Sequence, residues 1–163
     1  MEGIKQLKTI MQKQNQLLDL IKTIEKSKNE ILLSGKLVDF GNINENLGRL
    51  VEENSKLEIE RIKTTEKISR EIAKEQNKTL SFKEIVENIE EKDLKEEIFT
   101  TYEIMKSMIS DIRHLSKINQ EMVEVALQVI DISLSGVEER KDLDYTQNGR
   151  NNRDRSLLIN RLI

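Results

Sequence analysis

The sequence predicts an all-α protein: an elongated antiparallel bundle of three long helices, with a short helix and a flexible C-terminal tail. The chain has no Pro, 35% charged residues and only 3% aromatic residues, a composition typical of long helices and coiled coils. Apolar residues recur at alternating steps of three and four along three long segments, as on helices that pack through a narrow seam. So few aromatic side chains argue against a broad globular core, in which aromatic residues usually dominate the burial.

The first segment predicts a helix from about Gly3 to Leu33. Further Leu residues widen its apolar stripe, so we expect this helix to contact two neighbours rather than one. Ser34 and Gly35 end the helix, and Gly35 is suited to a left-handed cap. The seam positions of this segment are Leu7, Ile10, Gln14, Leu17, Ile21, Ile24, Lys28 and Ile31.

The second segment predicts a helix that begins after an N-cap at Asp39 and runs to about Gln76. Three of its seam positions are polar, so this helix is expected to be less buried near its middle. A short helix from Phe82 to about Ile89 follows, because the sequence SFKE at Ser81 fits a capping box. The seam positions of the second segment are Ile43, Leu47, Leu50, Asn54, Leu57, Arg61, Thr64 and Ile68.

The third segment has the longest seam, and its pattern fades beyond Glu139. Long amphipathic helices joined by short connections pack antiparallel, which predicts a helical bundle domain over residues 1–140 and a flexible tail over residues 141–163. The seam positions are Leu94, Ile98, Thr101, Met105, Met108, Ile112, Leu115, Asn119, Met122, Ala126, Val129 and Ser133.

Polar residues occupy several seam positions that apolar residues would usually fill, and five of them allow two interpretations. One interpretation is that they fix the register and orientation of the helices inside the bundle. The other is that they line a groove which receives a helix from another molecule. The five residues are Gln14, Asn54, Arg61, Thr101 and Asn119.

Composition and motifs argue against an enzyme and against several kinds of ligand. The net charge is −3 with acidic and basic residues interspersed, which does not suit nucleic-acid binding. No apolar run has the roughly 20 residues that span a bilayer, and no secretory signal is evident, so we expect a cytoplasmic protein. His114 and Asp111 form a single Asp-x-x-His pair, which cannot build a di-iron site. No metal or other cofactor is expected.

Several stretches taken in order resemble the FlgN family, the flagellar type III export chaperones for hook-associated proteins. SGKLVDFGNINENLGRLVEENSKLEIERIK resembles the family's second helix after a small-residue turn, and it includes an acidic-Arg run at Leu57 to Arg61. SFKEIVENI resembles its short segment after a loop. INQEMVEVALQVIDISL, with Asn119, is similar to its last long helix, and DYTQNG resembles its Tyr-x-x-x-Gly.

The resemblance implies a chaperone that binds the terminal helices of the hook–filament junction proteins FlgK and FlgL. It would prevent their premature assembly and deliver them to the export gate protein FlhA. Tyr145 matches the family tyrosine associated with gate docking. The resemblance leaves a homodimer open. The alternative function is a structural coiled-coil adaptor or dimerisation module in another assembly.

The C-terminal tail carries a polar string followed by a cluster of apolar residues. Such a cluster exposed to water would be an unexplained patch. We expect it to form a short amphipathic terminal helix with Ser156 as its N-cap. This helix either folds onto the chaperone's own groove until a client displaces it, or binds the client directly. The alternative is that the tail is a frayed end docked for stability. The four Arg residues of the tail either complement an acidic surface or only improve solubility. The expected client-binding residues are Leu157, Leu158, Ile159, Leu162 and Ile163, together with Met122 and Val129 on the last long helix.

Overall fold

The computed structural model of the chain describes residues 2–35, 40–73 and 80–145, with side chains up to residue 134. Within these ranges it contains helices and no strands, so the predicted all-α class is confirmed. No helix in the described part of the chain is long and apolar enough to cross a membrane. The helices are α1 (Glu2–Ser34), α2 (Phe40–Ile72), α3 (Phe82–Glu87) and α4 (Lys92–Tyr145).

The chain divides into two compact units, Met1–Met122 and Val123–Ile163. The first unit contains α1, α2, α3 and the first part of α4, and the second begins within α4. The predicted division into a bundle domain up to residue 140 and a tail from residue 141 stays a prediction. The backbone of α4 is helical as far as Tyr145.

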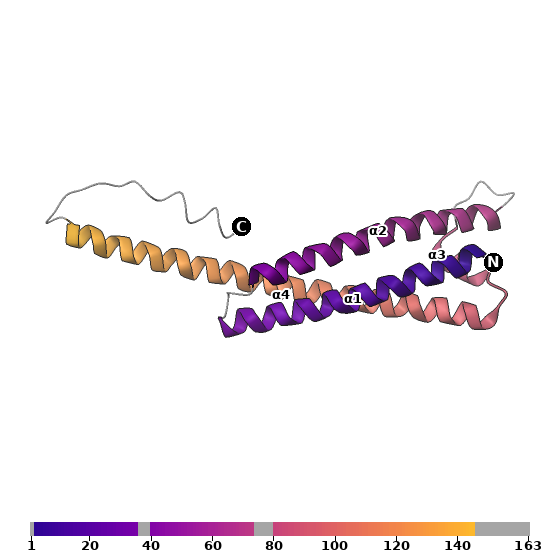
Figure 1. Cartoon of the computed structure of the whole chain (residues 1–163), viewed down its shortest axis with the longest axis horizontal. Helices are drawn as coiled ribbons and strands as arrows, with labels where there is room; N and C mark the ends of the chain where they lie inside the picture. Colours follow the sequence, from indigo (N-terminus) through magenta and orange to yellow (C-terminus); the bar gives the residue numbers. More distant parts are fainter. Residues whose placement is uncertain (1, 36–39, 74–79, 146–163) are drawn as a thin grey trace. The chain divides into compact units, whose positions relative to one another are not determined.

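Within the first unit, consecutive long helices run antiparallel (Figure 1). Gln14 of α1 donates a hydrogen bond to Glu58 of α2, whereas Gly3 at the start of α1 lies beside Ile68 near the end of α2. The first and the third long helices therefore run parallel.

Three contacts along α1 and α4 show this parallel direction. Their residue numbers rise together, from an ion pair near the start of α1 to an amide pair near its end. The contacts are Lys8 to Glu97, Lys22 to Asp111 and Asn29 to Asn119.

Helix α1 is the central element of the first unit, because two rows of its side chains are buried. The predicted seam is buried at Leu7, Ile10, Gln14 and Ile21. A second row is also buried, which confirms that α1 has two neighbours. The second row consists of Met11, Leu18 and Glu25, at intervals of seven residues.

Helix α2 is buried at its C-terminal end, and its remaining seam positions are half-buried. The buried residues are Thr64, Ile68 and Ser69. Ile68 belongs to a core cluster that includes Ile85 of α3 and Leu94 of α4, so the short helix covers this end. The sequence predicted lower burial only in the middle of α2, because its polar seam positions lie there. The sequence did not show that the short helix α3 covers only the C-terminal end of α2.

The predicted helix boundaries are close to those observed. Gly35 adopts a left-handed backbone conformation, with φ of 68°, and ends α1 as expected. Helix α2 ends at Ile72 rather than near Gln76, which lies outside the described residues, as does the predicted N-cap Asp39.

The predicted capping box at the start of α3 is confirmed. The Ser81 side chain accepts from the backbone of Glu84, and the Glu84 carboxylate accepts from the backbone of Ser81. Helix α3 ends at Glu87, two residues before the predicted Ile89, because Asn88 caps it.

Candidate partner-binding surfaces

The first candidate surface is the stretch of α4 over residues 123–134, called here the α4 stripe. Its large aliphatic side chains are exposed, including Val129 at 56% and Ile132 at 71%. They occupy two sides of the helix, because residues spaced by three, four or seven lie together. One side carries Val125, Val129 and Ile132, and the other carries Leu127, Ile130 and Leu134.

Exposed aliphatic side chains gathered in this way are unusual on a protein surface, so the α4 stripe is a candidate interaction site. The predicted seam positions Val129 and Ser133 are exposed, although the same spacing is buried earlier in α4 at Leu94, Ile98 and Met105. The surface chemistry of the α4 stripe therefore favours a partner that brings an apolar face.

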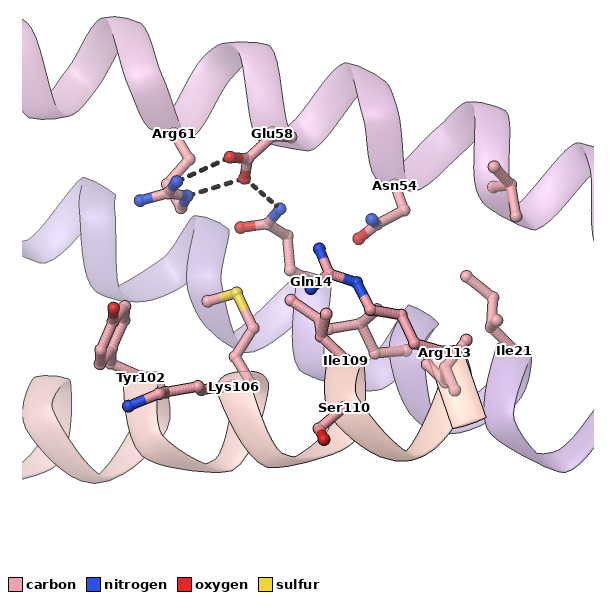
Figure 2. Close-up of a pocket in the computed structure, with 14 residues that line it drawn as sticks. Gln14, Ile21, Asn54, Glu58, Arg61, Tyr102, Lys106, Ile109, Ser110 and Arg113 are labelled. Atoms are coloured by element: carbon pink, nitrogen blue, oxygen red, sulfur yellow. Dashed lines mark hydrogen bonds and ion pairs between the residues drawn. The ribbon is translucent and has the colours of Figure 1, made fainter. Parts of the chain in front are cut away.

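The second candidate surface is a groove in the first unit, called here the α2–α4 groove (Figure 2). It has a volume of about 660 Å³, which lies within the usual range of about 300–1,000 Å³ for ligand pockets. Helices α2 and α4 form its two sides and α1 forms its floor. Its apolar lining consists of Leu18, Ile21, Val51, Met105, Ile109 and Ile112.

A charged pair from α2 lies on one side of this groove. Arg61 donates two hydrogen bonds to the Glu58 carboxylate, with distances of 2.8 Å from Nε and 2.7 Å from an Nη. These bonds lower the pKa of the Glu58 carboxyl, while its partial burial opposes them. Glu58 also accepts a hydrogen bond of 3.0 Å from the Gln14 side chain, so α1 and α2 are joined by a polar contact.

Two amide oxygens of the groove are buried without a hydrogen-bond partner among the described residues. They are Oε1 of Gln14, a residue only 2% exposed, and Oδ1 of Asn54. An unpartnered buried acceptor is costly, by about 1–3 kcal/mol. Both interpretations of the polar seam residues therefore find support at Gln14. Its Nε2 donates to Glu58 and so joins α1 to α2, whereas its Oε1 has no partner among the described residues, in a side chain that lines the groove.

Helix α4 contributes two cationic side chains to the opposite side of the groove. Lys106 and Arg113 are exposed and form no ion pair with another described residue. Figure 2 shows the Arg113 side chain directed from α4 into the groove, toward the region of Gln14 and Asn54. Among the residues that the structure describes, the groove thus combines apolar walls, two acceptor oxygens without a donor and two cationic side chains without a paired anion.

A third polar feature joins α1 and α4 near the end of the first unit. The Asn119 side chain is fully buried and donates to the Glu25 carboxylate at 2.6 Å and to the Glu25 carbonyl at 2.8 Å. Its oxygen accepts from Asn29 at 2.9 Å, and the Asn29 amide also lies 3.3 Å from the sulfur of Met122. These polar groups satisfy one another, so Asn119 acts here as a residue that fixes helix pairing.

The structure places only some of the predicted site residues. Met122 is half-buried beside Asn29, whereas Val129 is exposed on the α4 stripe. Tyr145 is the last residue of α4. The five apolar tail residues from Leu157 to Ile163 lie outside the described residues.

The structure adds residues to the candidate surfaces and contacts that the sequence did not indicate. Lys106 and Arg113 lie outside the seam, and nothing in their spacing marks them as lining a groove. The burial of Glu25 could have been predicted from the sequence, because Glu25 continues the seven-residue spacing of Met11 and Leu18.

The one histidine has no ligand-like surroundings. His114 is exposed, and Asp111, three residues earlier, is paired with Lys22. The hydrogen bond from Lys22 lowers the pKa of the Asp111 carboxyl. No group of three or more potential metal ligands occurs in the described ranges.

The family model described as FlgN protein matches residues 1–153. No curated protein and no solved structure matches the chain.

Proposed function

Because the chain belongs to the FlgN family of flagellar export chaperones, we propose that it binds the terminal helices of FlgK and FlgL. It keeps these hook–filament junction proteins from assembling early and delivers them to the export gate protein FlhA. The proposal is for a binding function without catalysis, exercised in the cytoplasm.

The observation that carries the proposal is the exposure of the α4 stripe. An amphipathic client helix can lay its apolar face along such a surface, with anchors at spacings of three, four and seven residues. Val125, Val129 and Ile132 provide matching positions on one side of α4. The client helix orders on binding, so the aliphatic contacts must offset its loss of conformational freedom.

Further parts of the client site are proposed from the sequence alone. Met122 directly precedes the α4 stripe and is proposed to contact the client as well. A second set of client contacts is proposed for the apolar tail residues Leu157, Leu158, Ile159, Leu162 and Ile163. Tyr145 is proposed to contact FlhA.

The experiment mixes the purified chain with a FlgK-type hook-associated protein and follows the pair by size-exclusion chromatography. The wild-type chain is expected to comigrate with it. The triple variant V125S/V129S/I132S removes three exposed anchors and is expected to weaken the complex by about tenfold or more, because buried interface anchors contribute roughly 1–3 kcal/mol each.

A matched control changes exposed aliphatic residues elsewhere. The variant I59S/I62S alters Ile59 and Ile62, which are exposed on α2, and should leave the complex intact. Failure of the wild-type chain to comigrate would reject the client assignment. A stable oligomer of the chain that shows no preference for such clients would instead support the structural adaptor.

A further inference from the structure

We propose that a pocket between α3 and α4, called here the α3–α4 pocket, receives an arginine-bearing amphipathic segment of another protein. The pocket has a volume of about 740 Å³ and shares only Tyr102 with the α2–α4 groove. It adds a second partner to the proposed function and does not depend on client binding. Its apolar and aromatic lining consists of Phe82, Val86, Phe99 and Tyr102.

The α3–α4 pocket gathers aromatic side chains, which are scarce in this chain. The sequence contains three Phe and two Tyr, and three of these five residues line the pocket. The rings of Phe82 and Tyr102 stack with their centroids 4.5 Å apart, and Val86 is buried in the core cluster, so this part of the lining is held in place. Phe99, in contrast, is 53% exposed. Exposed aromatic side chains beside a preformed pocket are typical of binding sites.

The surface around the pocket is acidic. Residues 81–103 contain eight acidic residues and three Lys, which gives this stretch a net charge of −5. Glu87, Glu96 and Glu103 line the pocket, are exposed, and form no ion pair with another described residue. The three Lys also line the pocket, so they reduce the negative charge without cancelling it. An excess of carboxylates attracts a cationic partner and speeds its association.

One side of α4 has the arrangement that a guanidinium group requires. Glu96, Phe99 and Glu103 follow one another at spacings of three and four residues, so the exposed ring lies between two carboxylates on one side of the helix. A guanidinium group can stack flat on the Phe99 ring and bind a carboxylate at the same time. A Lys ammonium has no flat surface, so the site favours Arg.

The other described Phe with a cationic neighbour shows what Phe99 lacks. The Nζ of Lys28 lies 5.4 Å from the centroid of the Phe40 ring, so that ring already has a cation over it. No cation of the described residues lies over the Phe99 ring. We therefore expect the cation to come from the partner, with the apolar face of the same segment covering Phe82 and Val86.

The tail of the chain has a similar composition, but it is too short to reach the pocket of the same copy. At about 1.5 Å per residue, α4 extends about 63 Å from Glu103 to Tyr145. Arg161 is the last of the four Arg of the tail, and a fully extended chain from Tyr145 to Arg161 spans at most about 58 Å. The occupant must therefore come from another molecule.

The test uses a short synthetic peptide in which Arg and Leu recur at helical spacing, labelled for fluorescence anisotropy. A second peptide carries citrulline in place of each Arg, which keeps the shape of the side chain and removes its charge. The full-length chain is expected to bind the Arg peptide, and to bind the citrulline peptide at least roughly tenfold more weakly.

Two variants of the chain remove the two parts of the site. F99S removes the exposed ring, and E96Q/E103Q removes the two carboxylates beside it. Each is expected to raise the Kd of the Arg peptide by roughly fivefold or more. Circular dichroism checks that both remain helical, as expected for substitutions at exposed positions.

Matched controls make the same kinds of change at exposed positions elsewhere. I59S and E53Q/E60Q alter exposed residues of α2, and E53Q/E60Q removes as much negative charge as E96Q/E103Q does. Both should leave the Kd of the Arg peptide unchanged. The α4 stripe variant V125S/V129S/I132S should do the same, because the peptide binds at the other surface.

Several results would overturn the proposal. They are no binding of the Arg peptide, equal binding of the two peptides, or a Kd that neither F99S nor E96Q/E103Q changes. A chain that ends at Tyr145 and binds the Arg peptide tenfold more tightly than the full-length chain would assign the pocket to the tail of a second copy instead.

Client binding is scored separately, so that the two proposals can fail independently. The F99S chain keeps its α4 stripe and should bind the FlgK-type protein as well as the wild-type chain does. A chain that binds the Arg peptide at the α3–α4 pocket and no FlgK-type protein would reject the client assignment and leave this proposal intact. Client binding without peptide binding would do the reverse.

Discussion

The two stretches of α4 on either side of residue 122 share one spacing of apolar residues and differ in exposure. Up to Met122, the seam positions Leu94, Ile98 and Met105 are buried. After it, the seam positions Val129 and Ser133 are exposed, Val129 at 56%. The spacing therefore predicts a helix and the side of it that is apolar. It does not reveal whether the element that covers this side belongs to the same molecule.

The largest contrast should come from one substitution made in both stretches. Ile98 is fully buried, and Ile132 is 71% exposed. We expect I98A to lower the free energy of unfolding by about 2–5 kcal/mol, since it leaves a cavity. I132A should change it by less than about 0.5 kcal/mol, as exposed substitutions usually do. Thermal and urea unfolding of dilute, monomeric protein measures both.

Equal losses for the two variants would contradict the contrast. In that case residues 123–134 would be covered within a single chain, and the α4 stripe would not be a docking surface.

The next effect concerns the polar contacts that Asn119 makes near the end of the buried stretch. The variant N119L removes both donors to Glu25 and leaves its carboxylate buried, since Glu25 is only 3% exposed. We expect a loss of roughly 3 kcal/mol in the free energy of unfolding. Urea unfolding at neutral pH measures it.

The double variant E25M/N119L provides the control for this loss. Replacing both partners by apolar residues of similar size is often nearly neutral, so most of the stability should return. A double variant as unstable as N119L alone would mean that helix packing, and not the buried carboxylate, accounts for the effect.

The helices were predictable from the sequence because their cause is local. Spacing predicted the three long segments, and Ser81 and Glu84 predicted the start of α3, since a capping box involves neighbouring residues only. The burial of Glu25 and the groove position of Arg113 depend on which helices meet and at what depth. No local pattern contains that information.

The candidate site was predictable only in part, for the same physical reason. The sequence drew attention to Val129 as an apolar residue on a helix, and the structure then showed it exposed. Val129 is a candidate binding residue because an apolar side chain is exposed to solvent there. Gln14 and Asn54 were flagged as polar seam residues, yet only the arrangement of three helices leaves their oxygens unpartnered.

A smaller loss than that of N119L is expected in the groove, at the Glu58–Arg61 pair. The pKa of Glu58 is lowered in the folded chain, chiefly by the hydrogen bonds from Arg61. A carboxyl with a depressed folded pKa stabilises the protein above its unfolded pKa, and this contribution is lost as pH falls through the folded pKa. E58Q should therefore cost about 0.5–1 kcal/mol at pH 7, as expected for a partly exposed pair.

The pH dependence separates this electrostatic contribution from a packing defect. The difference between wild type and E58Q should shrink as the pH falls below the ordinary Glu pKa of 4.5, and it should disappear once the pH lies below the lowered pKa of the folded chain, where the native carboxyl is protonated. Urea unfolding at several pH values between 3 and 7 follows the difference. A loss that persists unchanged at low pH would show that Glu58 supports the groove through its shape and not through its charge.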